Sequence, residues 1–152
     1  HEVELVVKID RVGKTISEEH APRYYSEVGL GLDLTARDVQ MRLKANGHPW
    51  ERAKAFDGSA VVGEFISLGD LGRDVQDLRF TLSNRDNILQ EGCTQNMLFS
   101  VNQLIAEVSR FMTLKVGDLL FTGTPAGVAP VKSGDRLVGT LEGRDLFAVD
   151  IK

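Results

Sequence analysis

Two glutamates near the start of the chain have the spacing of a metal site. Glu2 and Glu4 are separated by one apolar residue, and in a β-strand this spacing places both carboxylates on the same face. A third acid, Asp33, ends another apolar run. Carboxylate oxygens are the ligands that Mg²⁺, Mn²⁺ and Ca²⁺ prefer, so the three acids predict a site for one of these ions. By spacing alone, a solvated strand face remains the alternative interpretation.

Three side chains that bind anions follow the third acid. Arg37 and Gln40 are three positions apart and therefore share one face of a helix. Lys54 lies between two alanines, although Arg52 competes with it for the same role. We expect Arg37, Gln40 and Lys54 to bind a substrate carboxylate and to stabilise an enolate or oxyanion. For each of them taken alone, a solvated surface position is the more common finding.

The segment 122–127, Thr-Gly-Thr-Pro-Ala-Gly, follows a short apolar run. Its glycines and proline bend the chain, so backbone N–H groups and the Thr124 hydroxyl are expected to face a ligand carboxylate. A plain turn is the alternative. The segment is not a phosphate-binding P-loop, because it lacks the Gly-Lys-Ser/Thr ending that enters a helix.

Other kinds of catalytic centre have little support. The residues that bind zinc or act as strong nucleophiles are scattered along the chain: His1, His20, His48 and Cys93. No Gly-x-Ser-x-Gly elbow is present. The sequence therefore disfavours a zinc site, a thiol or serine nucleophile and a histidine base.

A series of strands is needed to position the acids. Alternation of apolar and polar residues predicts a half-buried strand over 2–9, and a short strand that ends at Asp33. Shorter apolar runs predict further strands at 61–66, 78–82, 88–90, 119–121, 137–141 and 146–151. Asn84, Arg85 and Asp86 are expected to connect two of these strands as a hairpin.

Three helices are predicted beside these strands. One begins at Ser17 and continues through Tyr25, and a second is capped by Thr35 and ends at Asn46. The third and clearest has an apolar stripe and runs from about Gln95 to Met112. Because helices rarely alternate with the short strands, the pattern favours an α+β, β-rich fold over a doubly wound parallel sheet.

Composition limits the classes of function. A length of 152 residues with 42% hydrophobic content is typical of one domain with a real core. The net charge of −4 disfavours nucleic acid or an anionic membrane as a partner, and no apolar run reaches the roughly 20 residues that span a bilayer. A single cysteine fits a reducing, cytoplasmic location. The chain starts without methionine and directly in a strand, so we expect a fragment of a longer protein.

Four motifs in order resemble the fumarylacetoacetate hydrolase family. They are His-Glu-Val-Glu-Leu at 1–5, Leu-Asp-Leu-Thr-Ala-Arg-Asp-Val-Gln at 32–40, Ala-Lys-Ala-Phe-Asp at 53–57 and Thr-Gly-Thr-Pro-Ala-Gly-Val at 122–128. Agreement continues through Gln90, Thr94 and Met97, so the resemblance covers nearly the whole chain. The residues of the second motif, and a Pro-Trp pair followed by Ala-Lys, most resemble those of the acylpyruvase and oxaloacetate decarboxylase branch.

The resemblance implies both a fold and a set of site residues. The fold would be the family's α+β catalytic domain, in which layered mixed β-sheets form a roll with a few short helices. Glu2, Glu4 and Asp33 match the family's Mg²⁺ or Mn²⁺ ligands. Arg37, Gln40 and Lys54 match positions that bind substrate or stabilise its enolate, and Thr124 matches a hydroxyl that holds a substrate carboxylate. Family members are usually homodimers.

The activity implied is metal-dependent chemistry on small anionic 2-oxo acids. The leading hypothesis is hydrolysis of a carbon–carbon bond in acylpyruvates. The alternatives are oxaloacetate decarboxylation, keto–enol tautomerisation or isomerisation, and a non-catalytic fragment that binds a metal or a keto acid. In the hydrolytic branch, a His-Glu pair on a lid before the metal motif activates water, and no residues here match it. We therefore expect residues 1–152 to be one catalytic domain that lacks an N-terminal region with the lid.

Overall fold

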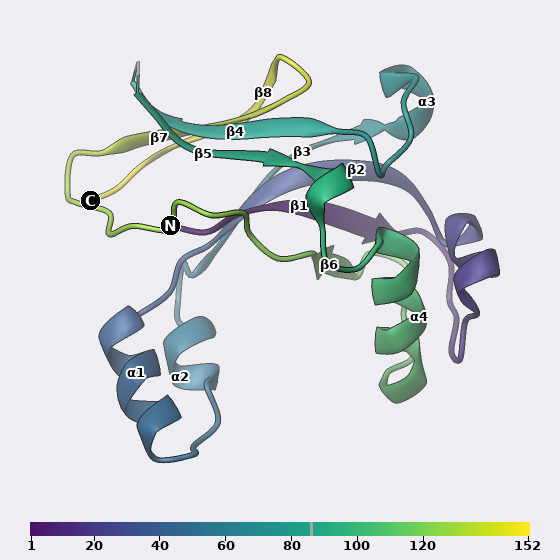
Figure 1. Cartoon of the computed structure of the whole chain (residues 1–152), viewed down its shortest axis with the longest axis horizontal. Helices are drawn as coiled ribbons and strands as arrows, with labels where there is room; N and C mark the ends of the chain where they lie inside the picture. The colour runs from purple at the N-terminus through teal and green to yellow at the C-terminus, as the bar shows by residue number, and fades with distance from the viewer. Residues whose placement is uncertain (86) are drawn as a thin grey trace.

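Two stacked four-stranded sheets form the body of the protein (Figure 1). The computed structural model describes residues 1–85 and 87–152. In the first sheet the strand order is β3 (Ala60–Ser67), β2 (Tyr25–Asp33), β1 (Val3–Ile9) and β6 (Leu119–Phe121). In the second sheet the order is β5 (Asn87–Cys93), β4 (Arg79–Asn84), β7 (Arg136–Leu141) and β8 (Arg144–Asp150). The predicted α+β, β-rich class with layered sheets is confirmed.

The strand pairing differs from the expected mixed sheets. Every strand pair in the described part of the chain is antiparallel. The connections explain this, because antiparallel neighbours can be joined by short turns, whereas a parallel pair needs a long crossover. Strands β4 and β5 are such neighbours, and they are joined where the hairpin was predicted, although Asp86 of that turn lies outside the described residues.

The core lies between the two sheets, and strand β1 contributes to it along its whole length. The inward side chains of β1 are at most 1% exposed: Val3, Leu5, Val7 and Ile9. The other face of β1 is covered as well, since Val6 is fully buried and Glu4 is 5% exposed. The strand predicted as half-buried is therefore buried on both faces. Its inner position in the sheet, between β2 and β6, contributes to this burial.

The helices are short and lie at the ends of the sheets. Helices α1 (Arg37–Ala45) and α2 (Glu51–Lys54) form a pair that extends away from the sheets, and α4 (Val101–Phe111) lies against the 3-10 helix at Glu18–Arg23 (Figure 1). The remaining turns of helix are α3 (Leu68–Leu71) and the 3-10 helices η1 (Glu18–Arg23) and η2 (Thr94–Asn96). Among the described residues, no helix has the length and apolar character needed to cross a membrane.

All three predicted helices begin or end at different residues in the structure. The first is a 3-10 helix that contains Pro22 and stops at Arg23, and Tyr25 already belongs to the nine-residue strand β2. The second starts after Ala36, so Thr35 is not its cap. The third starts after Ser100, which forms a capping box with Gln103.

Gly31 in β2 is required by close packing, because a side chain there has no space. A Cβ at this position would lie 2.6 Å from the Phe121 ring and 2.8 Å from the Val61 carbonyl oxygen. We expect Gly31→Ala to lower the free energy of unfolding by about 1–3 kcal/mol, measured by urea denaturation. Gly69→Ala is the control, because the only close atom there is the Ser67 hydroxyl oxygen at 3.3 Å. Equal denaturation midpoints for the two variants would contradict the prediction.

Candidate active site

The three acids come together where β1 begins and β2 ends. Strands β1 and β2 pair with Val3 opposite Leu32, and the Asp33 amide donates to the Glu2 carbonyl oxygen over 2.9 Å. This register brings one ligand atom each from Glu2, Glu4 and Asp33 within 4.8 Å of one another. The predicted convergence of the three carboxylates is therefore present. A cluster of three carboxylates is an arrangement that can hold a divalent cation.

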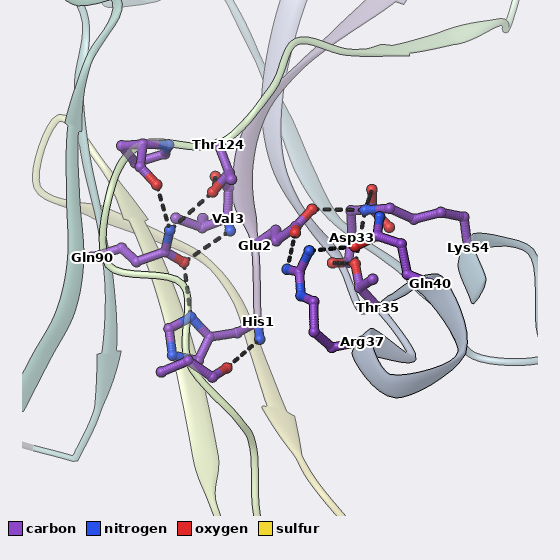
Figure 2. Close-up of polar contacts among 12 residues, drawn as sticks. His1, Glu2, Val3, Asp33, Thr35, Arg37, Gln40, Lys54, Gln90 and Thr124 are labelled. Atoms are coloured by element: carbon purple, nitrogen blue, oxygen red, sulfur yellow. Dashed lines mark hydrogen bonds and ion pairs between the residues drawn. The ribbon is translucent and has the colours of Figure 1, made fainter. Parts of the chain in front are cut away.

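Two cations reach the same cluster from the helix pair (Figure 2). The Lys54 ammonium group lies 2.7 Å from a Glu2 carboxylate oxygen and 2.6 Å from one of Asp33. Arg37, in the first turn of α1, donates to the other Glu2 oxygen. Lys54 also donates to the Thr35 hydroxyl over 2.7 Å. The sequence left Arg52 and Lys54 as alternatives for this role, and the structure places Lys54 against the acids.

Gln40 is linked to the acids through Arg37. Its side-chain oxygen accepts a hydrogen bond of 2.7 Å from Arg37, which confirms that the two residues share a helical face. Arg37 therefore contacts Glu2 on one side and Gln40 on the other. In this arrangement Gln40 orients the guanidinium group that faces the cluster.

The segment 122–127 closes the site over Glu4. The Gly123 amide donates to a Glu4 carboxylate oxygen over 2.6 Å, with Gly123 at a φ of +94°, which favours glycine. Thr124 donates its hydroxyl proton to the Val3 carbonyl oxygen over 2.8 Å and accepts from the Gln90 amide over 2.9 Å. The Thr124 hydroxyl can therefore bind a substrate carboxylate only by leaving Val3. That expected role stays a prediction.

The acids differ in how their surroundings change their pKa values. Burial raises the pKa of Glu4 to about 7, although the Gly123 amide opposes the shift and the charges of Asp33 and Glu2 add to it. Burial would also raise the pKa of Glu2, but the hydrogen bonds from Lys54 and Arg37 outweigh it and lower that pKa. The Glu4 carboxylate is thus the acid that lacks a cationic hydrogen-bond partner, and a bound cation would stabilise its charge.

Lys54 keeps its charge in this environment. Partial burial acts to lower the pKa of Lys54, but the hydrogen bonds to Asp33 and Glu2 outweigh it, and the pKa is raised above its ordinary value. Lys54 is therefore an ammonium group at neutral pH. Such a group donates hydrogen bonds and stabilises negative charge, but it does not accept a proton.

Sequence reasoning missed three residues of the site. Gln90 is 2% exposed and bonds to both β1 and the segment 122–127, and Thr35 accepts from Lys54. The His1 ring nitrogen Nδ1 lies 2.8 Å from the Gln90 side-chain oxygen. The available signals were weak, because Thr35 had the pattern of a helix cap and Gln90 is one polar residue in a short strand.

Comparison with known proteins identifies the chain's relatives. Residues 1–150 match the family described as Fumarylacetoacetate (FAA) hydrolase C-terminal. The chain is 44% identical over 146 residues to oxaloacetate tautomerase YcgM of Escherichia coli, covering 96% of this chain and 67% of that protein. It is 41% identical over 143 residues to the mitochondrial oxaloacetate tautomerase FAHD1 of Mus musculus, covering 94% of this chain and 64% of that protein.

A solved structure agrees with these relatives. The fumarylpyruvate hydrolase of Pseudomonas aeruginosa, in complex with Mn²⁺ and pyruvate, superposes with a TM-score of 0.92 at 36% identity. The match covers 99% of this chain and 64% of that one, so the chain spans about two thirds of the length of its relatives. The family match, the curated relatives and the fold agree, and the chain belongs to the fumarylacetoacetate hydrolase family.

Proposed function

We propose that this chain carries the metal and substrate site of a divalent-metal-dependent enzyme that tautomerises oxaloacetate between its enol and keto forms. The observation that carries the proposal is the cluster of three carboxylates in contact with Arg37 and Lys54. A centre that holds a cation beside fixed positive charges suits a dicarboxylate whose reaction develops an enolate. The names of the two tautomerase relatives support this choice of reaction.

The residues present fit Mg²⁺ or Mn²⁺. Glu2, Glu4 and Asp33 supply oxygen atoms only, and Glu4 is a buried acid without a cationic hydrogen-bond partner. The Mn²⁺ in the Pseudomonas relative supports the same class of ion. When bound, the ion would act as a Lewis acid that polarises the 2-oxo group of the substrate. Ca²⁺ has the same ligand preference and is the third candidate.

The chain's own side chains would bind and orient the substrate. Arg37, held by Gln40, offers a planar pair of donors to a carboxylate. Lys54 remains charged and would stabilise the enolate oxygen as negative charge grows on it. The substrate carboxylate would also reach the turn at Thr124. These roles require no covalent intermediate, since tautomerisation only moves a proton between C3 and the 2-oxo oxygen.

Hydrolysis of an acylpyruvate is the second candidate. The observation in its favour is the likeness to a fumarylpyruvate hydrolase with bound pyruvate, because pyruvate is the 2-oxo acid that such a cleavage releases. The same residues would stabilise the leaving enolate, but the reaction also needs a group that activates water. Decarboxylation of oxaloacetate uses the same enolate and differs only in the bond that breaks.

One panel of assays separates these reactions. The intact protein is mixed with Mn²⁺ or Mg²⁺ and given enol-oxaloacetate, keto-oxaloacetate or an acylpyruvate, and both enol absorbance and pyruvate formation are followed. Loss of enol absorbance without pyruvate is the expected result. Pyruvate from oxaloacetate would indicate decarboxylation, and pyruvate with a carboxylic acid from the acylpyruvate would indicate hydrolysis. Binding without turnover would identify a non-catalytic keto-acid site. If the protein neither bound nor converted any of these compounds, the proposal would be refuted.

Metal binding is expected to release a proton below neutral pH. Because the pKa of Glu4 is raised to about 7, its carboxyl group is mostly protonated at pH 6, and the proton must leave before the oxygen binds a cation. The affinity for Mn²⁺ should therefore be about tenfold weaker at pH 6 than at pH 8. Calorimetry at pH 6 in two buffers of different ionisation enthalpy measures the released proton. Equal heats in the two buffers would contradict the prediction.

The homodimer expected from the resemblance stays a prediction. Light scattering of the intact protein in solution would measure its mass and test it.

A further inference from the structure

Gln90 is a buried side chain whose hydrogen-bonding groups are all used (Figure 2). It lies in β5 and is 2% exposed. Its oxygen accepts from the Val3 amide over 3.1 Å and from the His1 ring over 2.8 Å. Its amide nitrogen donates to the Thr124 hydroxyl over 2.9 Å and to the Pro125 carbonyl oxygen over 3.1 Å. Two nitrogens face one end and two oxygens the other, so only one orientation of the amide satisfies them all.

These bonds join two segments that lie far apart in the sequence. One end of the amide holds the start of β1, which carries Glu2 and Glu4, and the other holds the segment 122–127, which carries the Gly123 amide. Gln90 itself has no hydrogen bond to any of the three carboxylates. Its effect on the cluster must therefore pass through the backbone that it holds.

The segment 122–127 is tied to β1 directly, since the Thr122 amide and hydroxyl donate to the Leu5 carbonyl oxygen over 3.2 and 2.9 Å, but it has little support on its other side. Residues 122–126 line one wall of an open groove of about 480 Å³, whose other walls include Leu5, Phe80, Met97 and Phe99. Where the segment faces the groove, no neighbouring atoms pack against it to hold its backbone in place. Gly127 is the exception, because a Cβ there would lie 2.8 Å from the Leu89 carbonyl oxygen, which shows that β5 approaches this end of the segment closely.

We infer that Gln90 is a positioning residue, which holds the segment 122–127 on the side that its direct bonds to β1 leave free and so keeps the Gly123 amide directed at Glu4. This inference rests on the proposed metal site. Residues that orient metal ligands without touching the metal typically change metal affinity about 10- to 100-fold when they are replaced. Gln90 adds a residue of the second sheet to a site whose other members come from the first sheet, the helix pair and the segment 122–127.

Two substitutions separate the two ends of the amide. Gln90→Glu keeps an oxygen for Val3 and His1 but places a second oxygen against the Pro125 carbonyl oxygen, so the bond to Pro125 is lost and the Thr124 hydroxyl can bond there only by turning its proton away from Val3. Gln90→Met keeps the length of the side chain and removes all four hydrogen bonds, which serves if the glutamate variant does not fold. Ser109→Ala is the matched control, because Ser109 is also fully buried and hydrogen-bonded but holds Ile16 at the other end of the molecule.

The experiment measures Mn²⁺ affinity well below each variant's unfolding temperature, together with the amide NMR signal of Gly123 in the metal-free protein. We expect both Gln90 variants to bind Mn²⁺ about 10- to 100-fold more weakly and to move the Gly123 signal, with unchanged affinity in the Ser109 control. Lower unfolding temperatures with unchanged affinity and an unmoved Gly123 signal would overturn the inference and leave the proposed function intact. If the parent protein bound no Mn²⁺, the proposed function would fail instead, and the positioning of Gly123 would still be decided by its signal.

Discussion

Replacing Glu4 with glutamine is expected to weaken Mn²⁺ binding strongly and, at the same time, to stabilise the metal-free protein. Glutamine can still accept the hydrogen bond from the Gly123 amide, so the backbone contact is kept. It carries no charge, however, and a neutral amide oxygen is a weaker ligand for a divalent cation than a carboxylate. We expect metal affinity and metal-dependent turnover to fall at least about 100-fold.

The gain in stability follows from the raised pKa of Glu4. The pKa is about 7 in the folded protein against an ordinary value of 4.5, so the folded state favours the protonated acid. This contribution to stability is complete below pH 4.5 and is lost as the pH rises through 7, at an order-of-magnitude cost of about 3 kcal/mol. Glu4→Gln removes that cost. The variant should exceed the parent by about 1–3 kcal/mol at pH 8 and by much less at pH 5.

Urea denaturation of both proteins in the presence of a chelator, at pH 5 and pH 8, measures this difference. Glu91→Gln on the exposed side of β5 is the control, and it should change neither metal binding nor the pH dependence. A Glu4→Gln protein that binds Mn²⁺ as the parent does would remove Glu4 from the metal site. Equal stability of variant and parent at pH 8 would show that the Glu4 carboxylate carries no such cost.

Lys54→Met is expected to reduce turnover about 100- to 1,000-fold, the usual effect of removing a donor that stabilises a developing oxyanion. The substitution also takes away the ammonium group shared by Glu2 and Asp33, and leaves two acids close together. Breaking a fully buried pair costs about 3–5 kcal/mol. Because Lys54 and Asp33 keep 28% and 27% of their side-chain surface exposed, we expect about 1–3 kcal/mol here.

A divalent cation should restore most of the stability of Lys54→Met but little of its turnover, because the cation neutralises the acids without replacing the ammonium group. Thermal unfolding with and without Mn²⁺, alongside the enol assay, separates the two effects. Lys54→Arg keeps the charge and tests whether the compact ammonium group is needed. Lys44→Met, on the exposed surface of α1, controls for the loss of one positive charge. Normal turnover by Lys54→Met would refute the role of Lys54.

The carboxylate cluster could be predicted because its members stand at ends of strands that the sequence marks clearly. Alternation placed Glu2 and Glu4 on one face of a strand, and Asp33 ended a predicted short strand, which the structure shows to be nine residues long. The pairing between these strands, with Val3 opposite Leu32, is a long-range choice that no local pattern contains. The resemblance to a family supplied that information, because spacing alone favoured a solvated face.

The network around Gln90 could not be predicted for a related reason. Gln90 and Val3 are 87 positions apart, and nothing in the run Leu89-Gln90-Glu91 indicates that the glutamine is buried. The predicted helix boundaries were wrong for a different reason. Capping patterns are local, and a residue with such a pattern does not always cap a helix. Ser100 and Gln103 form a capping box that marks the true start of α4, whereas Thr35 has the pattern of a cap but instead accepts a hydrogen bond from Lys54.

Strand β1 couples folding to chemistry, since one of its faces packs into the core and the other begins with the carboxylates of the site. If β1 slipped by one residue against β2, Glu2 and Glu4 would turn into the space between the sheets and Val3 and Leu5 would face the site. Such a misfolded chain would lose both its packing and its ligands, and it would be a ready substrate for proteolysis. Errors in this strand should therefore yield degraded protein rather than a stable, inactive population that competes for substrate.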